Sequence, residues 1–133
     1  MRIHFTLLLA IATLVGCSGS DSTDKGSAPT ITDVTLDKTE ITVGSLETIK
    51  ITVAYADPDG DVAKVDNQLV PQGGTSQPPG SLDIHEAAGQ KEGTQAFALQ
   101  IAAPAAGNAD VVFWLVDARG NESQKVTKTI TAK

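Results

Sequence analysis

Apolar and polar residues alternate along most of the chain after Thr30. This two-residue period is typical of β-strands that bury one face, and it differs from the period of a helix. The clearest alternation covers residues 46–55, where one face carries Ile49, Ile51, Val53 and Tyr55. Weaker or shorter patterns predict further strands at 31–36, 40–43, 62–70, 82–85, 94–102, 111–116 and 123–132. Seven or eight short strands without a helical stretch indicate an all-β fold, an antiparallel β-sandwich.

Residues typical of turns separate these segments. They predict tight turns at 57–61, at Gly107-Asn108 and at 118–121, and a longer connection through the Gly- and Pro-rich segment 72–81. The last predicted strand, 123–132, has an apolar face of only Val126 and Ile130, with Lys128 between them. Such a thin core face is typical of a strand at the edge of a sheet.

The first residues have a different pattern. Met1 and Arg2 give a short positive start, and residues 3–15 are apolar except for His4 and two threonines. This run is about two-thirds of the roughly 20 residues that a membrane-spanning helix needs, and a polar segment follows it directly. The pattern predicts a secretory signal peptide rather than a permanent transmembrane helix.

The end of this leader, Leu14-Val15-Gly16-Cys17, resembles the lipobox of bacterial lipoproteins. The resemblance implies that residues 1–16 are removed and that Cys17 carries fatty acyl chains that anchor the protein in a membrane. Cys17 is the single cysteine of the chain, so it has no internal disulfide partner. Ser18 follows it instead of the Asp that usually signals inner-membrane retention, which implies the outer membrane. The alternative is an ordinary cleaved signal peptide with a coincidental cysteine.

Composition divides the remaining chain into a tether and a domain. Residues 17–29 are mostly small and polar, so they bury too little apolar surface to order themselves and are expected to form a flexible linker. Residues 30–133 suit a single domain with its own core. The expected organisation is therefore a leader (1–16), a lipid-anchored linker (17–29) and one β-sandwich (30–133).

The net charge narrows the classes of partner. The whole chain carries −6, and loss of Arg2 with the leader makes the mature charge about −7. An acidic surface repels phosphate backbones and anionic headgroups, so nucleic acid is excluded as a partner and the lipid must anchor the chain.

Two segments resemble a known fold family. Residues 54–65 (AYADPDGDVAKV) and 110–130 (DVVFWLVDARGNESQKVTKTI) are similar to two corners of bacterial immunoglobulin-like domains, particularly the polycystic-kidney-disease (PKD) and fibronectin type III relatives. Residues 66–69 do not match the Trp-Asp-Phe-Gly-Asp-Gly motif that PKD repeats usually carry after the first corner. The resemblance therefore implies an Ig-like sandwich in the broader sense.

Three carboxylates form the most suggestive cluster. Asp57, Asp59 and Asp61 alternate around Pro58 and Gly60, and several oxygens aimed at one point suit a hard cation such as Ca²⁺. In an Ig-like sandwich the corresponding loops lie at one end, which would bring Asp117 and Asn121 close to the triplet. The spacing is not that of an EF-hand, because Val62 and Gln68 occupy the sixth and twelfth positions. The alternative is that these residues serve the turn through local hydrogen bonds, without a metal.

Catalytic motifs are scarce. His85-Glu86 begins like the zinc-protease motif HExxH, but Gly89 stands where the second His is needed. No nucleophile elbow, phosphate-binding loop or dinucleotide fingerprint is present in the sequence, so we expect no enzymatic activity and no certain cofactor beyond a possible calcium ion.

Binding remains the favoured class of function. Phe113 and Trp114 are adjacent on one predicted strand and must face opposite sides of the sheet, so Trp114 is a candidate contact point if its face is uncovered. The first hypothesis is a cell-envelope binding or adhesion module whose partner is a protein or a glycan. The alternative is a structural or accessory lipoprotein that acts as a spacer or assembly part, stiffened by calcium.

Overall fold

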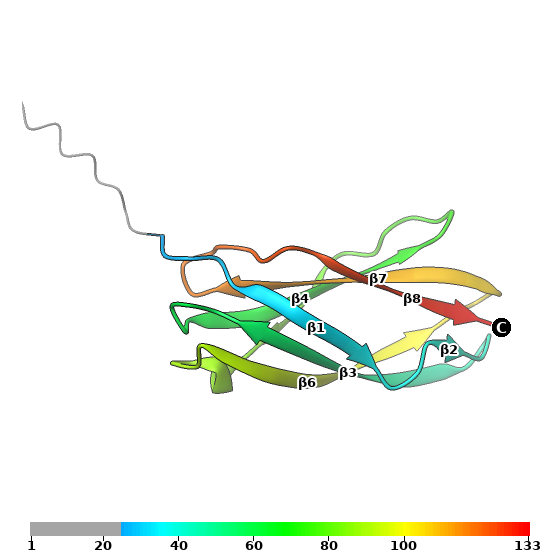
Figure 1. Ribbon diagram of the computed structural model, residues 1–133. Helices are drawn as coiled ribbons and strands as arrows, with labels where there is room; N and C mark the ends of the chain where they lie inside the picture. Colours follow the sequence, from blue (N-terminus) through cyan, green and yellow to red (C-terminus); the bar gives the residue numbers. More distant parts are fainter. Residues whose placement is uncertain (1–24) are drawn as a thin grey trace, which may run out of the picture.

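Two β-sheets pack face to face in the computed structural model, which describes residues 25–133 (Figure 1). One sheet has the order β1 (Thr30–Leu36), β3 (Leu46–Ala56), β6 (Glu92–Ala102). The other has the order β2 (Glu40–Ile41), β8 (Val126–Ala132), β7 (Gly107–Asp117), β4 (Val62–Pro71), β5 (Gly80–Asp83). This arrangement confirms the predicted Ig-like β-sandwich. Among residues 25–133, no helix is long and apolar enough to cross a membrane.

The strand pairs are antiparallel with one exception. The longest pairing joins β3 to β6 along their full lengths, from Leu46 opposite Ala102 to Ala56 opposite Glu92. The exception is β2, which runs parallel to β8 and pairs only with its last two residues. The expectation that β8 is an edge strand therefore holds for most of its length, where β7 is its one neighbour.

The core lies between the sheets, and the alternation seen in the sequence produces it. Ile49, Ile51 and Val53 of β3 face inward and are at most 1% exposed, as are Val111, Phe113 and Leu115 of β7. Phe113 meets Phe97 of β6 edge to face, with ring centroids 6.3 Å apart. Within residues 25–133, the core cluster extends from Ile31 to Ala132, so the two sheets share one hydrophobic core.

The turn predicted at Gly107-Asn108 is wrong. These residues begin β7, where they pair with Ala132 and Thr131. The chain instead bends at 103–106, where Pro104 cannot donate a ladder hydrogen bond. The Asn108 side chain accepts a hydrogen bond from the Thr131 hydroxyl at 3.0 Å, so this residue supports pairing instead of a turn.

Two further predicted strands have different limits in the structure. The strand expected at 82–85 lies at Gly80–Asp83, and one turn of 3-10 helix, η1 (His85–Ala87), follows where no helical residues were expected. The last strand begins at Val126 rather than at residue 123. Ser123 uses its hydroxyl oxygen, not a backbone carbonyl, to accept the hydrogen bond from the Leu115 N–H at 2.9 Å, so regular pairing starts only afterwards.

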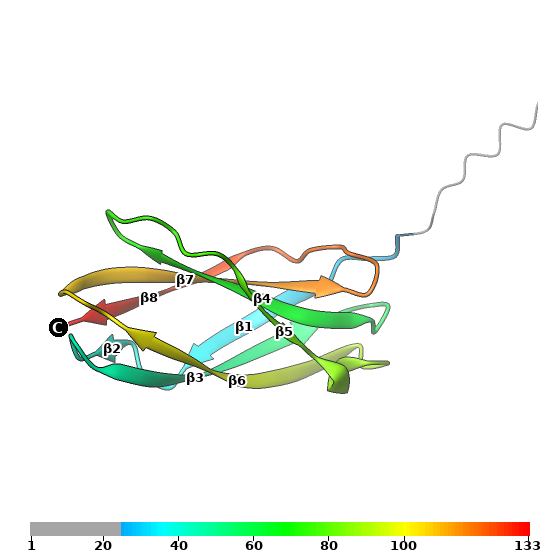
Figure 2. The same cartoon turned by 180° about the vertical axis from the view of Figure 1, so that it is seen from behind.

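The domain has two distinct ends (Figures 1 and 2). The described N-terminal segment enters at the end that carries the β3–β4 and β7–β8 turns. The C-terminus lies at the opposite end, beside the β6–β7 turn. The leader, the lipobox with Cys17 and most of the predicted tether lie outside the described residues. The last five residues of that tether, 25–29, are described and have no regular secondary structure.

Candidate functional site

The β3–β4 turn is organised by its first aspartate. Asp57 is 0% exposed, and its carboxylate accepts the N–H groups of Asp59 (3.2 Å) and Asp61 (2.7 Å). Its carbonyl accepts the N–H of Gly60 at 3.1 Å, and Gly60 has the positive φ of 69° that an L side chain rarely adopts. Asp57 therefore has the local role that aspartate often takes in turns.

The β7–β8 turn is built around Asp117 in the same way. This residue is 3% exposed, and its carboxylate accepts the N–H groups of Arg119 (2.9 Å) and Asn121 (2.7 Å) and the side-chain amide of Asn121 (2.6 Å). Burial alone would raise the pKa of Asp117. The hydrogen bonds from Asn121, Arg119 and Gly120 outweigh burial and hold its pKa below the ordinary value of 3.8.

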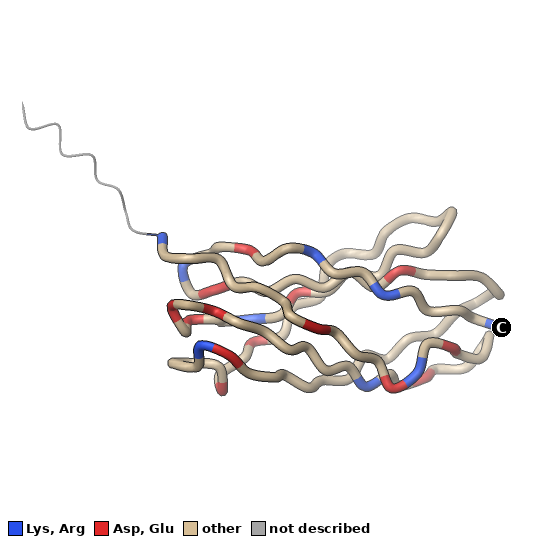
Figure 3. Tube along the Cα trace, in the orientation of Figure 1, with Lys and Arg blue, Asp and Glu red and all other residues tan. Residues whose placement is uncertain are grey.

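The two turns contact each other directly. The Ala118 N–H donates to the Asp61 carbonyl at 2.8 Å. The Arg119 guanidinium lies 3.6 Å from the carboxylate of Asp59 and 3.3 Å from that of Asp61. Burial, followed by the nearby charges of Asp117 and Asp57, raises the pKa of Asp61, and Arg119 opposes this shift. Figure 3 shows acidic and basic positions close together at this end of the molecule, and others at the opposite end.

The N-terminal segment is the third part of this loop cluster, which we define as residues 25–27, 57–61 and 117–121. The Ser27 N–H donates to the Asp59 carboxylate at 2.5 Å, and the Asn121 side-chain amide donates to the Lys25 carbonyl at 2.5 Å. Gly26 lies so close to Arg119 and Asp59 that a Cβ at this position would collide with both. The end of the predicted linker is therefore held against the β3–β4 and β7–β8 turns, a contact that sequence reasoning missed.

The Asp triplet has a geometry that can hold a cation. One carboxylate oxygen from each of Asp57, Asp59 and Asp61 lies within 4.8 Å of the other two. Oδ1 of Asp61 is buried and has no hydrogen-bond partner within residues 25–133. Two features oppose a metal: both Asp57 oxygens accept N–H groups of the turn, and Arg119 supplies a positive charge beside the other two carboxylates.

Asp117 and Asn121, the other two expected ligands, are not placed to share one metal site with the Asp triplet. Asp117 is close enough to affect the pKa of Asp61, but its carboxylate is used by its own turn. The Asn121 amide donates to Asp117 and Lys25. The structure thus brings all five predicted residues to one end of the sandwich and makes a compact group only of Asp57, Asp59 and Asp61. Sequence reasoning missed Arg119, although its position between Asp117 and Asn121 was a visible signal.

Trp114 lies on the outer face of β7 and is only 6% exposed. Its ring is covered by Lys125, whose Nζ lies 4.6 Å from the ring centroid, a distance typical of a cation–π contact. The expected apolar contact point is therefore closed in this structure. Its use as a binding surface would require Lys125 to move.

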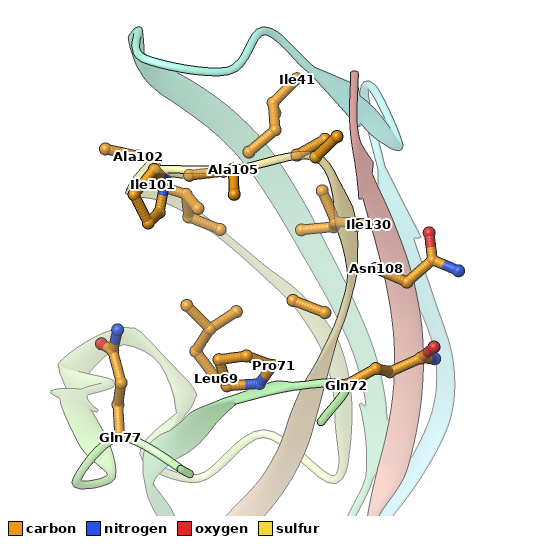
Figure 4. Close-up of a pocket in the computed structure, with 16 residues that line it drawn as sticks. Ile41, Leu69, Pro71, Gln72, Gln77, Ile101, Ala102, Ala105, Asn108 and Ile130 are labelled. Carbon is orange, nitrogen blue, oxygen red and sulfur yellow. The ribbon is translucent and has the colours of Figure 1, made fainter. Parts of the chain in front are cut away.

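An apolar pocket of about 340 Å³ lies at the opposite end of the sandwich from the loop cluster (Figure 4). Ile41, Leu69, Ile101 and Ile130 form its walls, and amide side chains at Gln72, Gln77 and Asn108 border it. Leu69 and Ile101 come from different sheets and point toward the same space (Figure 4). None of the described residues that line it is charged. Small-molecule and side-chain sites commonly have this size and apolar character.

Comparison with known proteins supports the fold. The structure is similar to the PKD domain of an M14-like peptidase from a Thermoplasmatales archaeon, with a TM-score of 0.52, 20% identity, and coverage of 80% of this chain and 97% of that one. It is similar to Spo0M, a sporulation control protein from Bacillus subtilis, with a TM-score of 0.52, 18% identity, and coverage of 80% of this chain and 50% of that one.

A third similar structure holds metal. The CARDB domain of a Pyrococcus furiosus protein, in complex with di-metal ions, matches with a TM-score of 0.50, 12% identity, and coverage of 81% of this chain and 94% of that one. No family model matches the sequence, and no curated protein matches it. At these identities the structural similarity supports a shared PKD- or CARDB-like fold and leaves ligands to be argued from this chain's own residues.

Proposed function

We propose that this chain is a lipid-anchored lipoprotein of the bacterial cell envelope whose Ig-like domain is a non-enzymatic binding or adhesion module. The lipobox resemblance at Leu14-Val15-Gly16-Cys17 supports the anchor, and Ser18 after the cysteine favours the outer membrane. The similarity to PKD and CARDB domains supports a module rather than a catalyst.

The observation that carries this proposal is that the N-terminal segment and the apolar pocket lie at opposite ends of the domain. The segment that leads from the anchor enters at the loop cluster, where Ser27 and Lys25 make hydrogen bonds. The apolar pocket and the β6–β7 turn lie at the other end, beside the C-terminus. A lipid on Cys17 would therefore hold the loop cluster toward the membrane and present the pocket end away from it.

The expected partner is a protein or a glycan. The acidic net charge of −6 disfavours nucleic acid, and the uncharged pocket suits an apolar side chain or the apolar face of a sugar. The pocket is the place where we expect a partner to make its most specific contact.

Three measurements test this proposal. Mass spectrometry of the mature protein should find an acylated Cys17 as the first residue, and an unmodified Cys17 or another first residue would remove the anchor from the proposal. Protease digestion of intact cells should cleave the domain if it is presented outside. A pulldown with residues 25–133 should recover a partner that is lost on Leu69→Asp, which places a charge in the pocket, and kept on Asp83→Ala at an exposed site. Equal recovery of the partner by the wild type, Leu69→Asp and Asp83→Ala would argue against the pocket as the binding site.

A spacer or assembly lipoprotein stiffened by Ca²⁺ is the second candidate. It is favoured by the compact Asp57, Asp59 and Asp61 group and by the unpaired buried oxygen of Asp61. Calcium at this position would brace the turn that meets the N-terminal segment. Calorimetric titration with millimolar calcium chloride, together with the melting temperature, tests this candidate, and the absence of heat and of a temperature shift would end it.

A further inference from the structure

We propose that β6 is a self-association edge, along which two copies of this domain pair antiparallel and join their three-stranded sheets into one continuous sheet. β6 is the last strand of its sheet and, within residues 25–133, pairs only with β3 (Figure 2). About half of the backbone N–H and C=O groups of such a strand point away from its one neighbour. The free edge is therefore a ready template for a further strand.

The composition of β6 leaves this edge unprotected. It is eleven residues long, and after Glu92 it contains neither a charged residue nor a proline. Natural sheets usually block long free edges with lysine, proline, bulges or shortness. After Glu92, the exposed outer face of β6 carries only the small or uncharged side chains of Thr94, Ala96, Ala98, Gln100 and Ala102. Another strand can pair along this stretch of the edge without meeting a charged side chain.

The other strands with a free edge are protected, including β8, whose stretch beyond the short pairing with β2 carries Lys128. β1 carries Asp33 and an irregular register between Ile31 and Asp33. β2 has two residues and includes Glu40, and β5 has four residues and includes Asp83. Within residues 25–133, β6 is thus the one long uncharged edge, and this contrast makes it a specific feature of the domain.

The charge pattern favours a second copy of this domain as the partner that pairs with the β6 edge. In an antiparallel pair of identical strands, every side chain lies opposite a residue of the same short segment, so a charged residue near the centre would meet its own charge. The chain as a whole carries −6, and two copies repel each other along most surfaces. The uncharged residues 93–102 form a strip along which they can meet without this cost.

The inner face of β6 also gains from a second copy. Phe97 and Leu99 point toward the core and remain only half-buried, because no strand of residues 25–133 lies beyond β6 to shield them. The equivalent side chains of a second β6 would cover them and remove more apolar surface from water. Ile101, near the end of the same strand, is buried and forms part of the wall of the apolar pocket.

Analytical ultracentrifugation of residues 25–133 over micromolar to millimolar concentrations tests this proposal. We expect a reversible monomer–dimer equilibrium. Ala98→Lys places a positive charge on the exposed outer face near the centre of β6, and should weaken the dimer about tenfold or more because the two lysines face each other. Thr127→Lys, at an exposed position on β8, is the matched control and should leave the dimer unchanged.

Circular dichroism and melting temperature show whether each variant is folded, and hydrogen exchange supplies a second readout. The β6 amides of the wild type should become more protected as concentration rises, and those of Ala98→Lys should not. A wild type that stays monomeric at millimolar concentration overturns the proposal, even if a different protein is found to bind along β6. So does a dimer that a folded Ala98→Lys variant does not weaken.

Discussion

The Nε of Arg119 lies 3.3 Å from the carboxylate of Asp61, across the contact between the β3–β4 and β7–β8 turns. This pair joins turns that are more than fifty residues apart in the sequence. It also places a cation where a metal ion would otherwise neutralise Asp59 and Asp61. Arg119 would therefore compete with a cation bound at these carboxylates.

Replacing Arg119 with alanine should increase the affinity for calcium. The side chain is 44% exposed, so its loss costs little folding stability, while Asp59 and Asp61 lose the positive charge beside them. We expect tighter calcium binding than in the wild type and a larger rise in melting temperature at the same calcium concentration. Isothermal titration calorimetry measures the first quantity and differential scanning calorimetry the second. Lys128→Ala, which also removes one positive charge, is the control, and equal affinities in both variants would contradict the prediction.

Asp117→Ala should lower the free energy of unfolding by about 2 kcal/mol or more, because it leaves several turn donors without their buried acceptor. The donors are the N–H groups of Arg119 and Asn121 and the side-chain amide of Asn121. Urea unfolding of residues 25–133 measures the change. Asp83→Ala, at an exposed site on β5, should change the value by less than about 0.5 kcal/mol. A similar small effect at both positions would show that Asp117 does not organise the turn.

Asp117 and Asp61 should respond to pH in opposite directions. The folded pKa of Asp117 is lowered, so its stabilisation is present above about pH 4 and is lost as pH falls through 3.8 and below. The folded pKa of Asp61 is raised, so its ionised form costs stability at neutral pH, and this cost disappears as pH falls through that pKa.

Asp61→Asn isolates the second effect. The variant should have a larger free energy of unfolding than the wild type at pH 7. This difference should shrink toward zero below about pH 3.8, where Asp61 of the wild type is protonated in both the folded and the unfolded state. Chemical unfolding at a series of pH values measures the difference. Asp83→Asn serves as the reference, and a stability gap at Asp61 that stays constant with pH would refute the assignment.

Lys125→Ala should expose the indole ring of Trp114, because the ammonium group lies 4.6 Å from the ring centroid. Trp114 is the single tryptophan of the chain, so intrinsic fluorescence reports on this site alone. We expect a red-shifted emission maximum, faster quenching by acrylamide, and a loss of about 0.5–1 kcal/mol of stability. Lys128→Ala should leave the spectrum unchanged. An unaltered spectrum in Lys125→Ala would mean that other groups shield the ring.

Local sequence pattern predicted most of the fold. The alternation of Ile49, Ile51 and Val53 defined β3, and the Asp57 and Asp117 turns fell where turn residues cluster. These features depend on the period of a strand and on hydrogen bonds between neighbours, both of which are visible in a single sequence. The expected Ig-like placement of the two Asp turns at one end also agrees with the contact between Ala118 and Asp61.

Features that depend on distant residues were not predictable in this way. Gly107 and Asn108 resemble turn residues, yet pairing with Thr131 and Ala132 places them in β7. The contacts of Lys25 and Ser27 with the loop cluster, and of Lys125 with Trp114, join side chains whose own neighbours give no hint of a partner. The pocket likewise exists only once two sheets are packed, because its walls come from both of them.

The entry of the chain at one end and its exit at the other determine how the domain would carry tension. A pull between the N-terminal segment and the C-terminus runs along β1 and β8, which point the same way through the molecule (Figure 1). The hydrogen bonds that join β1 to β3 lie across this direction, so the load falls on them together as shear instead of opening them one after another. Forced unfolding is controlled by the unfolding rate, which the equilibrium stability alone does not measure. We therefore expect this arrangement to give the domain mechanical resistance along its long axis.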